Sequence, residues 1–182
     1  MIAAIVGVAL AGCDAIKDAA STNFTVNGVK FDFTAVTSAM AIGNGEMSLM
    51  SGGTMNPFSA SRTVNISEIG SAELTEYASK ISKVVVSNSL LEITTNPSGN
   101  YTIEDLTISA TDVPGSLVIP SYTVGSTFTP PSTMNAYMAA FIMKLVSSKS
   151  LTVTVTGQTD APTGTTVNIS YENTVVFTAS LF

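Results

Sequence analysis

The chain has 182 residues, of which only 11% are charged, and its formal net charge is −6. Its seven basic residues, Arg62 and six scattered lysines, form no cluster, which argues against nucleic-acid binding and against electrostatic attachment to an anionic membrane. The chain contains no histidine, which excludes Ser-His-Asp triads and histidine-ligated metal sites.

An apolar run opens the chain and leads directly to its only cysteine, Cys13. The run from Ile2 to Leu10 has the length of a signal-peptide core, and it falls short of the roughly 20 residues that a membrane-spanning helix needs. The stretch Leu10-Ala11-Gly12-Cys13 resembles a bacterial lipobox. A free cysteine can also be a small buried hydrophobe, but its place after small residues favours the lipobox.

The resemblance implies cleavage between Gly12 and Cys13, followed by attachment of lipid to the sulfur and the new amino terminus of Cys13. Residues 1–12 would then be a signal peptide, residues 13–22 a flexible tether, and residues 23–182 a single domain. Two or three acyl chains hold a protein on a membrane far better than a single one does. The general character resembles small lipoproteins of Gram-negative bacteria, which implies a cell-envelope location, in the outer membrane, facing the periplasm or the exterior. We expect no cofactor besides this covalent lipid.

Apolar and polar residues alternate over 24–35, as in a half-buried antiparallel strand. Asn27-Gly28 interrupts the alternation, and this dipeptide between alternating hydrophobic residues predicts a β-hairpin. The Gly- and Met-rich segment 43–61 is expected to hold a strand fragment with loops. The same alternation recurs over 151–156 and 167–181, with threonine opposite the aliphatic residues. The predicted strand-derived core is Phe24, Val26, Phe31, Phe33, Leu91, Ile93, Leu106, Ile108, Leu151, Val153, Val155, Val167, Ile169, Val175 and Phe177.

Two segments have helical periodicity. Residues 71–82 place Leu74, Tyr77, Ala78 and Ile81 on one face, with Ser71 as the expected N-cap. The second helix follows Pro130-Pro131, with Ser132 or Thr133 as its expected cap. Its apolar stripe faces either the sheet or an apolar ligand, and direct packing is the favoured interpretation; the stripe consists of Met134, Tyr137, Met138, Phe141 and Leu145.

The two helices belong to segments with a similar order of elements: helix, strand, loop with Pro97 or Pro162, and strand. This order suggests two related helix–strand–strand units, although two unrelated units could look alike. The sequence therefore predicts a mainly β fold, either an antiparallel sandwich or a curved sheet, with two amphipathic helices covering open edges or one face.

Residues for catalysis or metal binding are sparse. No phosphate-binding glycine motif is present, and no Asp-rich loop suggests a metal site. The adjacent acids Glu104 and Asp105 are expected to point to opposite faces of a strand and so not to cooperate.

We therefore expect a non-enzymatic lipoprotein acting as a binding, adhesive or structural module, with an envelope protein or a surface glycan as partner. One alternative is a carrier of an apolar ligand beneath the helices. Another is a filament subunit related to lipoprotein pilins, in which proteolysis after Arg62 removes the N-terminal hairpin and opens a groove for strand addition.

Overall fold

The computed structural model describes residues 21–39 and 55–180. Cys13, the lipobox and most of the predicted tether lie outside the described residues. The first strand already begins at Ser21, two residues before the predicted start of the domain.

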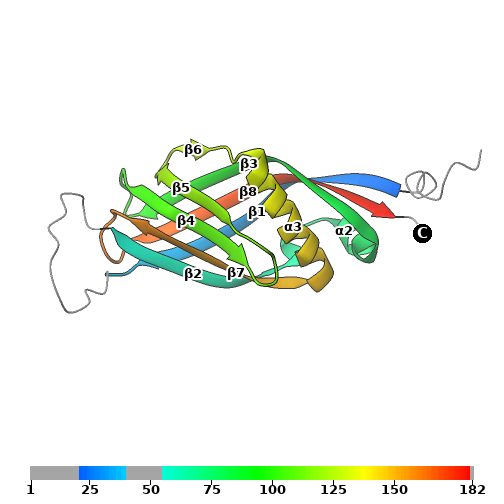
Figure 1. The fold of residues 1–182 in the computed structure, drawn as a ribbon, viewed down its shortest axis with the longest axis horizontal. Helices are drawn as coiled ribbons and strands as arrows, with labels where there is room; N and C mark the ends of the chain where they lie inside the picture. Colours follow the sequence, from blue (N-terminus) through cyan, green and yellow to red (C-terminus); the bar gives the residue numbers. More distant parts are fainter. Residues whose placement is uncertain (1–20, 40–54, 181–182) are drawn as a thin grey trace, which may run out of the picture.

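Eight antiparallel strands form one sheet in the order β5-β4-β7-β2-β1-β8-β3-β6 (Figure 1). β1 and β8, the first and last of the described strands, are therefore neighbours in the middle of this order. The strands are β1 (Ser21–Thr37), β2 (Asn56–Asn65), β3 (Ile81–Asn96), β4 (Thr102–Ala110), β5 (Leu117–Thr123), β6 (Thr127–Phe128), β7 (Ser150–Thr159) and β8 (Thr166–Ser180).

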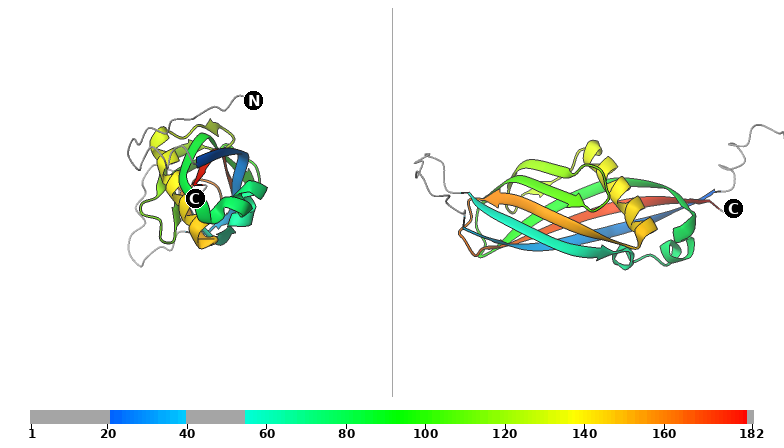
Figure 2. Two further views of the ribbon diagram at one scale, coloured as in Figure 1. Left: turned by 90° about the vertical axis from the view of Figure 1, so that its right-hand side faces the viewer. Right: turned by 60° about the horizontal axis from the view of Figure 1, so that its bottom comes forward.

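The sheet is curled, so that its two outermost strands, β5 and β6, can be consecutive in the chain. Only three residues join β5 to β6, although β6 pairs with β3 at the opposite edge of the sheet. Gly125, in this connection, donates its N–H to the Ile93 carbonyl of β3 at 3.2 Å. Figure 2 shows the strands curling around the interior when the molecule is seen end-on. Of the two predicted architectures, the curved sheet is the one observed.

The long predicted helix is confirmed as α3 (Ser132–Ser148), which lies across the sheet and contacts β3, β5 and β7. The other is shorter than predicted: α2 (Ala72–Tyr77) is preceded by a 3₁₀ turn, η1 (Ile66–Ile69), and followed by another, η2 (Ala78–Lys80). Ser71 caps α2 as expected, accepting the Leu74 N–H. Ile81, predicted as helical, already belongs to β3, because pairing with Ala179 of β8 outweighs the local helical pattern.

The predicted core is confirmed. Phe24 and Val26 are partly buried, and the other predicted core residues are buried inside the curl. Thr152 and Thr154 lie on the outer face of β7, whereas Val153, between them, is 1% exposed. The alternation of apolar and threonine residues thus identifies which side of the sheet faces the interior.

The hairpin predicted at Asn27-Gly28 is wrong, because β1 continues through it with a β-bulge between Val26 and Val29. Gly28 has a φ of 67°, the left-handed conformation that a hairpin turn would also need. Two further bulges follow the same rule, at Asn88 in β3 (φ 48°) and at Asp105 in β4 (φ 52°). At each bulge, the inward-facing residues on either side are three positions apart instead of two. The extra residue allows both of them to face the interior of the sheet.

The two predicted units occur in the expected order, as α2–β3–β4 and α3–β7–β8. In neither unit are the two strands neighbours in the sheet. Relatedness between the units stays a prediction.

Candidate functional site

The interface between α3 and the inner face of the sheet is where the sequence placed a candidate apolar-ligand site. Met138, Phe141 and Leu145 are buried there, and Met134 and Tyr137 are partly buried against the same core. The Phe141 ring meets Phe31 of β1 edge-on, with centroids 5.3 Å apart and planes at 85°. All five stripe residues therefore take part in packing against the sheet.

The ends of α3 explain how the helix is positioned. Pro131 is its N-cap residue and makes no side-chain capping bond, so the expected capping by Ser132 or Thr133 is wrong. Ser132 is instead the first helical residue. At the other end Lys149 adopts a left-handed conformation, donates its N–H to the Leu145 carbonyl at 2.8 Å, and turns the chain into β7.

The space between α3 and the sheet is small. A cavity of about 10 Å³ remains there, and its lining is apolar. That volume holds about one water molecule, which is too little for an apolar ligand of the size that a carrier would bind. The lining residues are Phe31, Phe33, Ile108, Ala110, Tyr137, Met138, Phe141, Val153 and Tyr171.

Two phenols at this cavity stand out chemically. Tyr171 is 1% exposed, and neither its hydroxyl nor that of Tyr137 has a hydrogen-bond partner of good geometry. Burial raises the pKa of Tyr171, and the nearby Ser89 hydroxyl offsets part of that rise. Burial likewise raises the pKa of Tyr137, offset in part by the Ala110 backbone. Both groups are therefore neutral hydrogen-bond donors at ordinary pH.

A buried polar cluster lies beside these phenols, at the start of α3. Ser89 Oγ is 2.6 Å from Asn135 Oδ1 on α3 and 2.8 Å from Asn173 Oδ1 on β8. A hydroxyl has one proton to donate, so one of the two asparagines must present its amide nitrogen to Ser89. The cluster ties the start of α3 to two strands.

Sequence reasoning missed Ser89 and Asn173. Asn173 does carry a signal, because it shares the inward parity of Tyr171 and Val175 in β8. A polar residue at such a position indicates a buried hydrogen-bonding partner. Ser89 carries a weaker signal, since its inward orientation depends on the bulge at Asn88.

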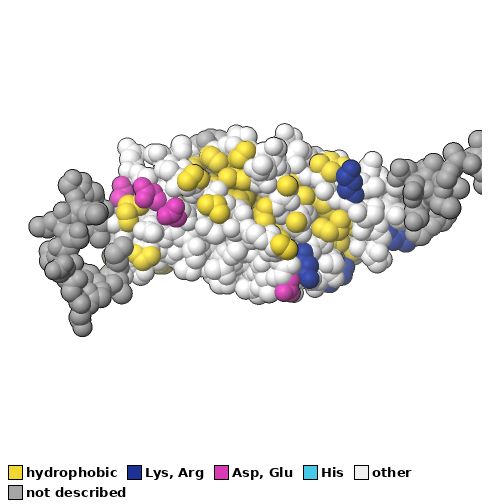
Figure 3. Space-filling view, viewed as in Figure 1, with side chains coloured by type: hydrophobic (Ala, Val, Ile, Leu, Met, Phe, Trp, Pro, Cys, Tyr) yellow, Lys and Arg dark blue, Asp and Glu magenta, His cyan; other side chains and the backbone are white. Residues whose placement is uncertain are grey.

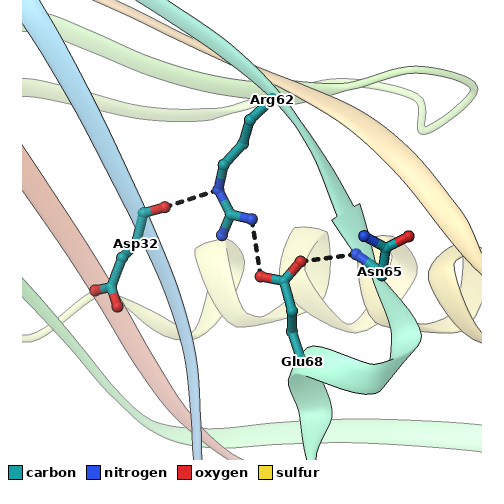
Figure 4. Close-up of polar contacts among 4 residues, drawn as sticks. All are labelled: Asp32, Arg62, Asn65 and Glu68. Atoms are coloured by element: carbon teal, nitrogen blue, oxygen red, sulfur yellow. Dashed lines mark hydrogen bonds and ion pairs between the residues drawn. The ribbon is translucent and has the colours of Figure 1, made fainter.

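A second polar arrangement bridges β1 and β2, which pair directly only at Val36↔Ser59 and Thr37↔Phe58. Farther along, Arg62 of β2 donates from Nε to the Asp32 carbonyl of β1 at 2.8 Å (Figure 4). Its Nη1 bonds Glu68 Oε2 at 2.8 Å, and its guanidinium lies 4.9 Å from the centre of the Phe33 ring. These contacts link two diverging strands, which is a structural role.

The acidic residues offer no site in the described part of the chain. Glu104 and Asp105 are both exposed, because the bulge at Asp105 turns both side chains outward; the expectation of opposite faces is wrong. Figure 3 shows a few acidic side chains near one end of the molecule. Within residues 21–39 and 55–180, no group of three or more acidic residues could hold a metal ion.

The described helices include none that is both long and apolar enough to cross a membrane. Comparison of the chain with protein-family models, curated proteins and solved structures finds no match.

Proposed function

We propose that the protein is a membrane-anchored bacterial lipoprotein whose curled β domain is a non-catalytic binding, adhesive or structural module. The observation that carries this proposal is the direct packing of α3 on the sheet, which leaves only about 10 Å³ between them. A domain filled in this way is a rigid scaffold that acts through its outer surface. Serine and threonine side chains dominate the outer face of β2 and β7, a surface suited to an envelope protein or a surface glycan.

The anchor in this proposal is Cys13, in the lipobox-like stretch Leu10-Ala11-Gly12-Cys13. β1 begins at Ser21, so only a short stem would separate the lipid from the folded domain. The domain would therefore sit close to an outer membrane, facing the periplasm or the exterior.

The anchor is tested on protein extracted from its native membrane. Mass spectrometry should find an N-terminal peptide that starts at Cys13 and carries acyl chains. Cys13→Ser should release the chain from the membrane, whereas Lys17→Gln, a control in the same segment that keeps the thiol, should not. An unmodified Cys13 thiol or an intact Met1 would contradict the proposal.

A carrier of an apolar ligand is the second candidate. It is favoured by the two unpartnered phenols, Tyr137 and Tyr171, at an apolar cavity. A fluorescent fatty-acid analogue should show no saturable binding if the domain is a scaffold. Saturable binding that Met138→Trp abolishes, while the folded structure persists, would favour the carrier.

The filament alternative has less support. Arg62 lies within β2, pairs with Val153 of β7, and is half-buried through its bond to Glu68. Cleavage there would break a paired strand. An arginine-specific protease should leave the native chain uncut at Arg62; excision of the N-terminal segment followed by polymerisation would revive this alternative.

A further inference from the structure

One end of the molecule is a three-stranded arm in which β1 is an outer strand. Extending the register of Val36↔Ser59 places Asn65, the last residue of β2, opposite Lys30. The earlier part of β1, from Ser21 to Asn27, therefore runs past the end of β2, with β8 and then β3 on its other side. Figure 1 shows β1 and β8 extending together beyond α3.

The register fixes which backbone groups of this segment face away from β8. Thr37 donates its N–H to the Thr165 carbonyl. The backbone N–H and C=O groups of the odd-numbered residues along β8 therefore point to β1. Val175 and Phe177 are odd, and their partners Val26 and Phe24 are consequently the residues hydrogen-bonded to β8. The N–H and C=O groups of the intervening residues, Asn23 and Thr25, point to the other side.

The other edges of the sheet are protected, and this one differs. α3 packs against β3, β5 carries Pro120, and β6 has only two residues. Among the described residues, no strand pairs with Asn23 or Thr25 on the side away from β8. The segment 21–29 also lacks proline and charge, the usual devices that keep an edge strand from pairing.

We propose that this edge pairs with the same edge of a second copy of the chain, as two antiparallel β1 strands related by a two-fold axis. Self-pairing suits the sequence, because an uncharged segment brings no like charges together. It also suits the burial pattern. Phe24 and Val26 face the interior yet are only half-buried, whereas Val29 and Phe31 farther along β1 are 1% exposed. An antiparallel copy would place its own Phe24 and Val26 on the same face and cover them.

The test measures amide hydrogen exchange on the full chain in detergent solution, at two protein concentrations a hundredfold apart. The amides of Asn23 and Thr25 should exchange at least tenfold more slowly at the higher concentration. The amides of Phe24 and Val26, bonded to β8, should be protected at both. Fast exchange of Asn23 and Thr25 at both concentrations would overturn the proposal. Slow exchange of Asn23 at both concentrations that persists in a monomeric Thr25→Pro variant would also overturn it, since the chain's own residues would then cover the edge.

A pair of variants separates this contact from association through other parts of the chain. Thr25→Pro removes the outward N–H, and sedimentation should show the mass of the associated species falling by half. Thr25→Val keeps the amide and should remain associated. Protected Phe24 and Val26 amides would show that the proline variant is folded. Association that survives Thr25→Pro in a folded chain would refute pairing through β1.

Discussion

Truncation of Phe141 to alanine tests whether α3 and the sheet are packed together. The side chain is 4% exposed and meets the Phe31 ring edge-on at 5.3 Å. Removing a buried phenylalanine costs about 3–5 kcal/mol, of which an aromatic pair accounts for about 0.5–1.5 kcal/mol. For a domain of this size the loss corresponds to a fall in melting temperature of about 6–20 °C.

The measurement is equilibrium unfolding in urea, with Leu90→Ala as the control. Leu90 is also a large apolar residue, but it lies on the outer face of β3 with 39% of its surface exposed. Its truncation should cost less than about 1 kcal/mol. If Phe141→Ala costs as little as Leu90→Ala, the helix does not rest on the sheet in solution, and the scaffold argument fails.

Three further predictions concern polar and backbone features. Burial raises the pKa of the Tyr171 phenol, so its contribution to stability is present below the ordinary pKa of 10.0 and is lost as the pH rises through the raised value. The midpoint of urea unfolding should therefore be lower at pH 11 than at pH 8. Tyr171→Phe should reduce that difference. A double-mutant cycle of Arg62→Met and Glu68→Gln, measured on the free energy of unfolding, should give a coupling of only about 0.2–1 kcal/mol, because both side chains are about one-third exposed. A coupling above about 2 kcal/mol would mean that the pair is shielded from water. Asn88→Val should lower the free energy of unfolding by about 1–2 kcal/mol in thermal unfolding, since a branched side chain disfavours a φ of 48°. Asn88→Gly should be nearly neutral. Equal losses of stability in the two variants would refute the backbone explanation.

The inward face of each strand could be predicted from alternation, because burial on one side of a sheet imposes a period of two. The hairpin failed for a specific reason. Asn27-Gly28 supplies the left-handed backbone that both a tight turn and a bulge require, so the dipeptide does not distinguish them. What decides between them is the long-range register of β1 with β8, and no local pattern contains that information.

In the candidate site, too, some features could be predicted from local sequence and others depend on contacts between distant residues. The stripe of α3 could be predicted from helical spacing, and its amphipathic character favours direct packing on the sheet. The cluster beneath it joins Ser89, Asn135 and Asn173, which lie far apart in the chain and meet only because β3, α3 and β8 converge. The shorter α2 reflects a competition that local propensity could not resolve, since β8 recruits Ile81 into a strand.

The position of β8 has a consequence for when the molecule can fold. β8 is the last strand of the described chain, yet it lies between β1 and β3 and pairs with both along nearly its whole length. Until β8 emerges from the ribosome, β1 has no long partner, and the sheet cannot assemble by successive addition of strands. Such distant pairing makes folding slow. Under the proposal that this chain is a lipoprotein precursor, which is threaded through a translocon before it folds, this delay would keep the chain in a form that can be exported.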